Sequence, residues 1–169
     1  MYNNKIRSHP SPLHPIVSIG PFTKWDIDFM TCNPYSIGGN GYIIIAVDYF
    51  TKWVEAMPTF ENTGKTIALF IFNHIITRFG ISQAIVTDHG SHFQNFMTSE
   101  LTEKLGLQHE NSTPYYPQAN GQVEEIKKVL ITMLRWIIGI HKTSWHTMLF
   151  SALWAYQTSM KSSMGFTPF

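Results

Sequence analysis

The chain has 169 residues, of which 44% are hydrophobic and 14% are charged. This length and composition predict one folded domain with a sizeable core and exclude a disordered segment. Twelve Lys and Arg residues balance eleven Asp and Glu residues, so contact with nucleic acid depends on where the basic side chains lie, not on a general basic excess. A single cysteine, Cys32, excludes an internal disulfide and a Cys-rich zinc site. No apolar run has the length of a membrane span, so we expect an intracellular protein.

The first 22 residues contain four prolines and show no regular spacing of apolar residues. Proline fixes φ and removes a backbone donor, so such a stretch is typical of irregular chain. His9 and His14 lie in this stretch without a nearby cysteine pair and are interpreted as surface residues. We therefore predict a lead-in over residues 1–22 and one domain over residues 23–169.

An alternating stretch, Lys24–Met30, predicts the first strand of the domain. Side chains two residues apart on a strand share a face, so Asp26 and Asp28 lie together on one face. The opposite, apolar face consists of Trp25, Ile27 and Phe29. This strand should therefore have one face in the core and present two carboxylates on the other.

The remaining elements show extended and helical patterns in turn. Tyr42–Asp48 predicts a buried strand and Trp53–Met57 a returning strand that ends at Pro58, which completes an antiparallel meander. The later elements are a helix capped by Asn62 or Thr63 and closed by Gly80, a strand at Ile85–Val86 parallel to its neighbour, a helix over Phe93–Leu105, a strand over Leu107–Asn111, a loop over Ser112–Gly121, a long helix, and a helix from Ser144. The order β-β-β-α-β-α-β-α-α predicts an α/β fold with a mixed five-stranded sheet flanked by helices.

The two last helices each carry an apolar stripe at steps of three and four residues, which is typical of a helix with one face in the core. In the long helix the stripe is Val123, Ile126, Leu130, Met133 and Ile137. In the last helix it is Trp145, Met148, Leu149, Ala152, Leu153 and Tyr156. Both helices should therefore pack against the sheet.

Three carboxylates lie near the ends of predicted elements. Asp28 belongs to the first strand, Asp88 follows the strand at Ile85–Val86, and Glu124 lies in the first turns of the long helix, 35 residues after Asp88. Carboxylate oxygens suit Mg²⁺ and Mn²⁺, and two such ions about 3.5–4 Å apart stabilise the attacking and leaving oxygens of a phosphoryl displacement. The three acids therefore predict a two-metal site, although each one alone is also typical of a turn or a cap.

Six short motifs follow one another along the chain. They are Trp25-x-x-Asp28-Phe29, Val47-Asp48-Tyr49-Phe50-Thr51-Lys52-Trp53-Val54-Glu55-Ala56, Thr87-Asp88-x-Gly90-x-x-Phe93, Ser112-Thr113-Pro114-Tyr115-Tyr116-Pro117-Gln118-Ala119-Asn120-Gly121-Gln122-x-Glu124, Leu153-Trp154-Ala155-Tyr156-x-Thr158-Ser159 and Gly165-x-Thr167-Pro168-Phe169. From about Leu13 to the end, the chain thereby resembles the catalytic core of retroviral-type integrases, and most closely that of plant Ty3/gypsy-type retrotransposons.

The resemblance implies a ribonuclease H-like fold with a DDE active site formed by Asp28, Asp88 and Glu124. These acids would hold two Mg²⁺ or Mn²⁺ ions, and no zinc is expected in this chain. Asp26 is the near alternative to Asp28, but the family pattern places the acid directly before Phe29. The implied activity is that of an integrase, a polynucleotidyl transferase that trims the 3′ ends of retroelement cDNA and joins them to target DNA. DNA partners, self-association and a nuclear location are implied by the same resemblance.

Residues around the acids are candidates for contact with DNA. They are Tyr116, Gln118, Asn120, Lys127 and Lys128. The first three belong to a stretch that resembles the active-site loop of the family. The two lysines lie one helical turn after Glu124 and are candidates to hold phosphates. The alternative is an ion pair between Glu124 and Lys128, four residues apart on a solvated helix face.

Four positions depart from the family pattern. Lys127 stands where the family usually has Asn, Glu125 where it has a small residue, His89 where it has Asn, Arg or Gln, and Thr31-Cys32 where Gly-Pro is common. An added carboxylate and a changed neighbour of the active-site glutamate would alter metal or DNA-end geometry. A second interpretation therefore stays open: a truncated, catalytically inactive retroelement remnant that keeps a nucleic-acid-binding or dimerising fold.

The family's zinc-binding N-terminal module and DNA-binding C-terminal domain are not in this sequence, which ends inside a family motif, so we expect a truncated core. Trp136 and Trp145 are predicted to be exposed and are candidates for a dimer interface. His92, like His89, is interpreted as a surface or DNA-facing residue and not as a zinc ligand.

Overall fold

The computed structural model describes residues 20–88, 90, 92–111, 117–138, 142–161 and 165–168. Most of the predicted lead-in, residues 1–19, lies outside these residues, and residues 20–23 form turns before the first strand. No helix within the described ranges is both long enough and apolar enough to cross a membrane.

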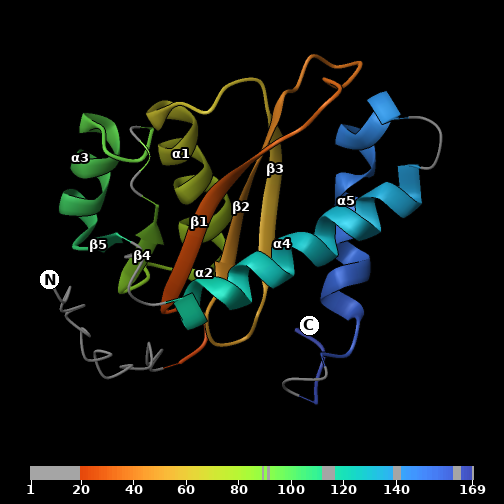
Figure 1. Cartoon of the computed structure of the whole chain (residues 1–169). Coiled ribbons are helices and arrows are strands. Elements are labelled where there is room, and N and C mark those ends of the chain that lie inside the picture. The colour runs from red at the N-terminus through yellow and green to blue at the C-terminus, as the bar shows by residue number, and fades with distance from the viewer. Residues whose placement is uncertain are drawn as a thin grey trace, which may run out of the picture.

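The described residues form strands and helices in the predicted order (Figure 1). The strands are β1 (Lys24–Thr31), β2 (Tyr42–Asp48), β3 (Val54–Thr59), β4 (Ala84–Thr87) and β5 (Gln108–Asn111). The α-helices are α1 (Gly64–Phe70), α2 (Thr77–Phe79), α3 (Phe96–Leu105), α4 (Pro117–Ile138) and α5 (Trp145–Thr158). A π-helical segment, η1 (Ile71–Ile76), joins α1 to α2, and a 3₁₀ turn, η2 (Lys142–Ser144), precedes α5.

The strands form one mixed sheet in the order β3-β2-β1-β4-β5. β1 pairs antiparallel with β2, and β2 pairs antiparallel with β3, as the meander predicted. β4 lies parallel to both β1 and β5. Helical segments lie between β3 and β4 and between β4 and β5, which gives the chain the length that a parallel pairing needs. The prediction of a mixed five-stranded sheet is confirmed.

Helices cover both faces of this sheet. On one face, α4 and α5 pack over Met30, Ile43, Ile45 and Val86, and Figure 1 shows α4 crossing in front of the strands. On the other face, α1, η1 and α3 pack over Trp25, Ile27, Ile44 and Ile85. The predicted alternation of β1 is confirmed, since its even-numbered side chains point toward the α4 side.

Proline accounts for two of the element boundaries that differ from the predictions. β3 does not end at Pro58 but continues to Thr59, with Pro58 opposite Ile43. β3 is an edge strand, so the missing N–H of a proline there costs no ladder bond. α4 begins at Pro117, so the predicted loop was wrong for residues 117–121, while residues 112–116 lie outside the described ranges. Proline is favoured in the first turn of a helix because no intrahelical donor is needed there.

Side-chain oxygens cap the N-termini of α1 and α3. The Thr63 hydroxyl accepts from the backbone N–H of Thr66 at 3.4 Å, which settles the choice left open between Asn62 and Thr63. The helix predicted from Phe93 begins three residues later, where the Asn95 side chain accepts from the N–H of Thr98 at 3.0 Å. The π-helical segment η1 was not predicted, since its apolar residues fit the spacing of an ordinary helix.

The core face of α4 and the predicted exposure of Trp145 required corrections. Leu134 is buried where Met133 was predicted, and Met133 is only partly buried. Trp136 is 83% exposed, as predicted. Trp145 is 4% exposed, and its indole N–H donates to the carbonyl of Pro34 at 3.1 Å. The proposed interface role of Trp145 was therefore wrong, because its ring and its polar group are both used inside the domain.

Candidate active site

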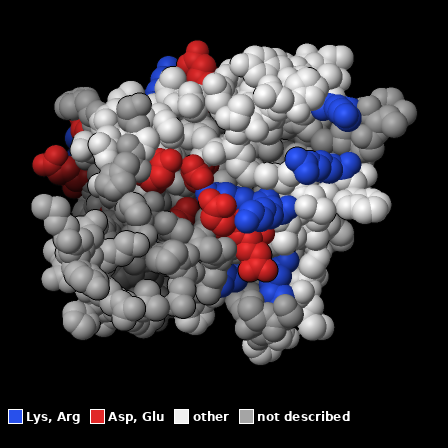
Figure 2. All heavy atoms as spheres, in the orientation of Figure 1, with Lys and Arg blue, Asp and Glu red and all other residues white. Residues whose placement is uncertain are grey.

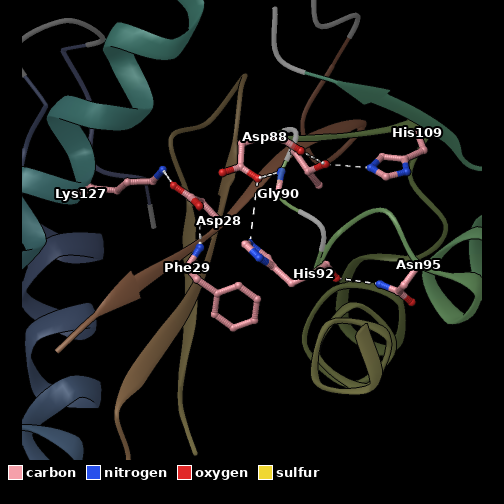
Figure 3. A network of polar contacts seen from close by, with 9 residues as sticks. Asp28, Phe29, Asp88, Gly90, His92, Asn95, His109 and Lys127 are labelled. Carbon is pink, nitrogen blue, oxygen red and sulfur yellow. Dashed lines mark hydrogen bonds and ion pairs between the residues drawn. The ribbon is translucent and has the colours of Figure 1, made fainter. Parts of the chain in front are cut away.

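Asp28 and Asp88 come together where β4 ends beside β1. The last registered pair of these parallel strands is Ile27 with Thr87, so the next residue on each strand is an aspartate. Asp88 leaves the sheet at this point, whereas Asp28 lies within β1 and not at its end. Figure 3 shows the two side chains next to each other. The predicted convergence of these two acids follows from this register.

Each aspartate is held by a backbone N–H through one carboxylate oxygen. The N–H of Phe29 donates to Asp28 Oδ1 at 2.7 Å, and the N–H of Gly90 donates to Asp88 Oδ1 at 2.8 Å. The side chain of Asp28 is 26% exposed and that of Asp88 is 53% exposed. Both carboxylates therefore keep a fixed orientation while staying accessible from outside.

Lys127 reaches from α4 to the free oxygen of Asp28. Its Nζ forms an ion pair with Asp28 Oδ2 and donates a hydrogen bond to it (Figure 3). Its side chain is only 13% exposed, so this lysine is held in the site and does not extend into solvent. The next residue, Lys128, is exposed. Neither Lys128 nor Glu124 has an ion-pair partner within the described residues, so the alternative pairing of these two side chains is not formed.

Asp26 lies beneath this pair and is buried. It is 8% exposed, and the hydroxyl of Tyr49 donates to its Oδ2 at 3.0 Å. Burial raises the pKa of Asp26 from 3.8 to about 6, although the positive charge of Lys127 and the Tyr49 hydrogen bond oppose this shift. Asp26 is therefore committed to an internal hydrogen bond, and Asp28 is the accessible acid of the two.

Two histidines line the β4 side of the site (Figure 3). The His92 ring contacts Phe29 and Phe93 at centroid distances of 5.4 and 4.6 Å, and its side chain is 25% exposed. His92 is thus only partly exposed, and its surface or DNA-facing role stays a prediction. His92 Nε2 lies 4.0 Å from Asp88 Oδ1, beyond hydrogen-bond distance. His109 Nε2 and the hydroxyl of Thr87 share a hydrogen bond of 2.8 Å, and burial lowers the pKa of His109. The residue pattern of β5 did not predict the hydrogen bond between His109 and Thr87.

Glu124 stands apart from the two aspartates. It is exposed on α4, one turn before Lys127. Within the described ranges, no cluster of three or more His, Cys, Asp or Glu side chains is close enough to hold a metal ion. The structure therefore brings Asp28 and Asp88 together and leaves the third predicted acid on the helix above them.

The donor groups fit a hard divalent cation. Asp28 and Asp88 both offer carboxylate oxygens, which Mg²⁺ and Mn²⁺ prefer. A positive group already lies against Asp28 Oδ2, since the ammonium of Lys127 occupies that side of the carboxylate. Position and charge thus both favour a cation at this end of the sheet.

The candidates for DNA contact are only partly described. Tyr116 lies outside the described residues, and Gln118 and Asn120 lie in the first turns of α4, where their side chains are not described. Figure 2 shows basic and acidic side chains gathered together near the middle of the visible face, not a purely basic patch. This mixture agrees with the near balance of twelve basic and eleven acidic residues in the sequence.

Comparison with solved structures identifies the class of domain. The crystal structure of the catalytic core domain of BIV integrase is 25% identical in sequence and superposes with a TM-score of 0.72, covering 87% of this chain and 91% of that one. A simian T-cell lymphotropic virus intasome in complex with the PP2A regulatory subunit B56 gamma gives a TM-score of 0.82 at 20% identity, covering 98% of this chain and 59% of that one. The fold is therefore ribonuclease H-like, as predicted.

Sequence comparison identifies the family. The chain belongs to the integrase core domain family, whose profile matches residues 20–117. It is 31% identical over 150 residues to the Pol polyproteins of radiation murine leukemia virus (strain Kaplan) and feline endogenous virus ECE1, and to the Gag-Pol polyprotein of Koala retrovirus. Each alignment covers 88% of this chain but only 26%, 14% and 9% of the respective relatives. The resemblance to retroviral-type integrase cores is confirmed.

Proposed function

We propose that the chain is the catalytic core of an integrase from a Ty3/gypsy-type retrotransposon of a plant. It would process the 3′ ends of retroelement cDNA and join them to target DNA in the nucleus, as part of a larger assembly of identical chains. The observation that supports this most directly is the pairing of Asp28 and Asp88 at the end of β4, within a domain of the integrase core family.

Asp28, Asp88 and Glu124 are the residues that would hold Mg²⁺ or Mn²⁺. Two bound ions would stabilise the charge that develops on the attacking and leaving oxygens of an in-line phosphoryl displacement. The N–H groups of Phe29 and Gly90 orient the two aspartates before substrate arrives, which reduces the reorganisation needed. Glu124 completes the set only if α4 or its own side chain moves toward the aspartates.

The lysines and the start of α4 would supply the contacts to DNA. Lys128 is exposed one turn after Glu124, where its ammonium could contact the phosphates of bound DNA. Gln118 and Asn120 lie in the first turns of the same helix, next to Tyr116 in sequence. A nucleic acid bound along this end of α4 would pass the two aspartates.

A specific observation also favours the alternative, a catalytically inactive remnant. Lys127 is paired with Asp28, and Glu124 is not gathered with the other acids. Both features would be expected where selection no longer maintains a metal site. Such a remnant would keep the fold and its capacity to bind nucleic acid or to dimerise.

A disintegration assay tests the proposal against this alternative. The purified chain is given a branched DNA with Mn²⁺, and release of the joined strand is measured for wild type, Asp88→Asn and Glu124→Gln. We expect activity in wild type and a loss of at least about 100-fold in each variant, since each removes one charged oxygen ligand. Circular dichroism shows whether the variants are folded.

The outcomes separate the two functions clearly. Activity that survives Glu124→Gln would remove this residue from the catalytic set. A folded wild-type chain that releases no product, at Mn²⁺ concentrations where binding is saturated, would favour the inactive remnant.

A further inference from the structure

Among the described side chains of α4, Lys127 is the basic one that reaches Asp28. Its side chain is 13% exposed, and its ammonium lies against Asp28 Oδ2, while the other oxygen, Oδ1, accepts from the N–H of Phe29 at 2.7 Å. Both oxygens of Asp28 are therefore occupied by donors from this chain. Asp88 differs, because one N–H donor holds its Oδ1 and half of its side chain remains exposed.

The charges around Lys127 explain why the ammonium stays there. Asp26, Asp28 and Asp88 lie near one another at one end of the sheet, and the negative charges of Asp28 and Asp88 both act on buried Asp26. Like charges this close are unfavourable without a cation between them. Lys127 supplies one positive charge to this group, and its charge is felt by Asp26 as well as by Asp28.

We propose that Lys127 is an internal counter-ion that occupies the cation position at Asp28, and that a divalent cation has to displace it in order to bind. The inference rests on the proposed function, since it takes Asp28 as a metal ligand. An ammonium and a divalent ion on the same carboxylate oxygen would lie within about 4 Å of each other and repel strongly. Metal binding therefore exchanges one cation for another.

The geometry of α4 permits this exchange. Lysine has a long flexible stem and a point charge, so it can leave Asp28 without any movement of the helix. Solvent reaches the contact itself, since the side chain of Asp28 is 26% exposed and that of Lys127 is 13% exposed. The displaced ammonium would then stand one turn from Glu124, where it is available to a phosphate of bound DNA.

Displacement has a measurable effect on metal affinity. When a ligand binds only the open state, its apparent dissociation constant rises by the inverse of the fraction that is open. If Lys127 is paired in about nine molecules of ten, Lys127→Met should bind Mn²⁺ about tenfold more tightly than wild type. Lys128→Met is the matched control, because it removes the same charge one residue away without touching Asp28, and its affinity should change less than about twofold.

The first measurement is Mn²⁺ binding to the full chain, by titration with the electron paramagnetic resonance signal of free Mn²⁺. The second is lysine acetylation followed by mass spectrometry, with and without Mn²⁺. We expect Lys127 to be acetylated slowly without metal and several-fold faster with it, while exposed Lys128 reacts at one rate throughout. Asp28→Asn should release Lys127 to fast acetylation in the absence of metal.

The outcomes distinguish this inference from the proposed function. Equal Mn²⁺ affinity in wild type and Lys127→Met overturns displacement and leaves the metal site intact. Mn²⁺ binding without any change in Lys127 acetylation also overturns it, since metal and ammonium would then coexist. Absence of Mn²⁺ binding in both proteins removes the metal site and the displacement together.

Discussion

Two carboxylates on this sheet, Glu55 and Asp28, are each paired with a basic residue but in different surroundings. Glu55 on β3 has a side chain that is 5% exposed, and it accepts from Arg78 and from the indole N–H of Trp53, both at 2.6 Å. Asp28 on β1 is 26% exposed, and among the described side chains Lys127 is the one that donates to it. Glu55 is thus enclosed by rigid, planar donors, whereas the partner of Asp28 is a flexible point charge.

This difference separates an enclosed ion pair from one that we propose to be exchangeable. A buried carboxylate with a guanidinium and an indole donor contributes to the fold only as long as every partner stays in place. A partly open carboxylate with one exchangeable cation can change partners at little cost. Both residues belong to motifs that pointed to the integrase family, so motif membership alone does not distinguish the two kinds of ion pair. The burial of the carboxylate and the type of its donor distinguish them.

The largest expected effect is on the enclosed pair. Arg78→Met takes the guanidinium away from buried Glu55 and leaves it the Trp53 indole donor and His74 at 3.9 Å, and we expect it to lower the free energy of unfolding by about 2–4 kcal/mol. Urea unfolding followed by tryptophan fluorescence measures the loss. The double variant Glu55→Gln/Arg78→Met should recover part of it, because it removes the carboxylate charge that lost the guanidinium. A loss no greater than that of Lys127→Met would contradict the comparison.

Asp26 is a buried carboxylate like Glu55, although it lies only two residues from Asp28. Tyr49→Phe removes the hydroxyl that donates to Asp26, and we expect a loss of about 1–3 kcal/mol at pH 8. The pKa of Asp26 in the fold is about 6, so at pH 5 the carboxyl is protonated and loses less when the donor is removed. The same urea titration at the two pH values checks this. An equal loss at pH 5 and pH 8 would show that the carboxylate is not the group affected.

The exchangeable pair should matter less for folding than the two buried carboxylates. Lys127→Met removes the counter-ion of Asp28, but a carboxylate that is 26% exposed can be hydrated in its place. We expect a change in unfolding free energy below about 1 kcal/mol, while the same variant changes Mn²⁺ affinity about tenfold. Lys128→Met serves as the reference for removal of one charge from α4. A loss of stability equal to that of Arg78→Met would make Lys127 a structural residue.

The spacing of apolar and polar residues was sufficient to predict how β1 and β4 position Asp28 and Asp88. Alternation fixed the two faces of β1, and a helix before β4 required a parallel pairing, which together put Asp88 next to Asp28. These inferences depend only on residue periodicity and on strand geometry. They succeed because a strand slipped by one residue would expose its whole apolar face.

The contacts between α4 and the sheet could not be predicted from the spacing of residues along the chain. Lys127 meets Asp28 because α4 crosses the sheet at a particular angle and height, which depends on how Ile126, Leu130 and Leu134 pack. The sequence showed Lys127 only as a neighbour of Glu124 on the same helix. The hydrogen bond of the Trp145 indole was missed for a related reason, since its partner carbonyl at Pro34 is 111 residues away in the chain.

The smallest expected effect concerns His109, which supports β4 from the side opposite Lys127. Burial lowers the pKa of His109 below 6.5, so the fold prefers the neutral ring, whose Nε2 is bonded to the Thr87 hydroxyl at 2.8 Å. This contribution to stability is complete above pH 6.5 and is lost as the pH falls below it, because the unfolded chain then binds the proton more readily. His109→Gln should therefore flatten the decline in unfolding free energy between pH 7 and pH 5, which urea titrations at several pH values would measure. An unchanged slope would mean that His109 stays solvated, and that the end of β4 depends on its backbone pairing alone to hold Asp88 beside Asp28.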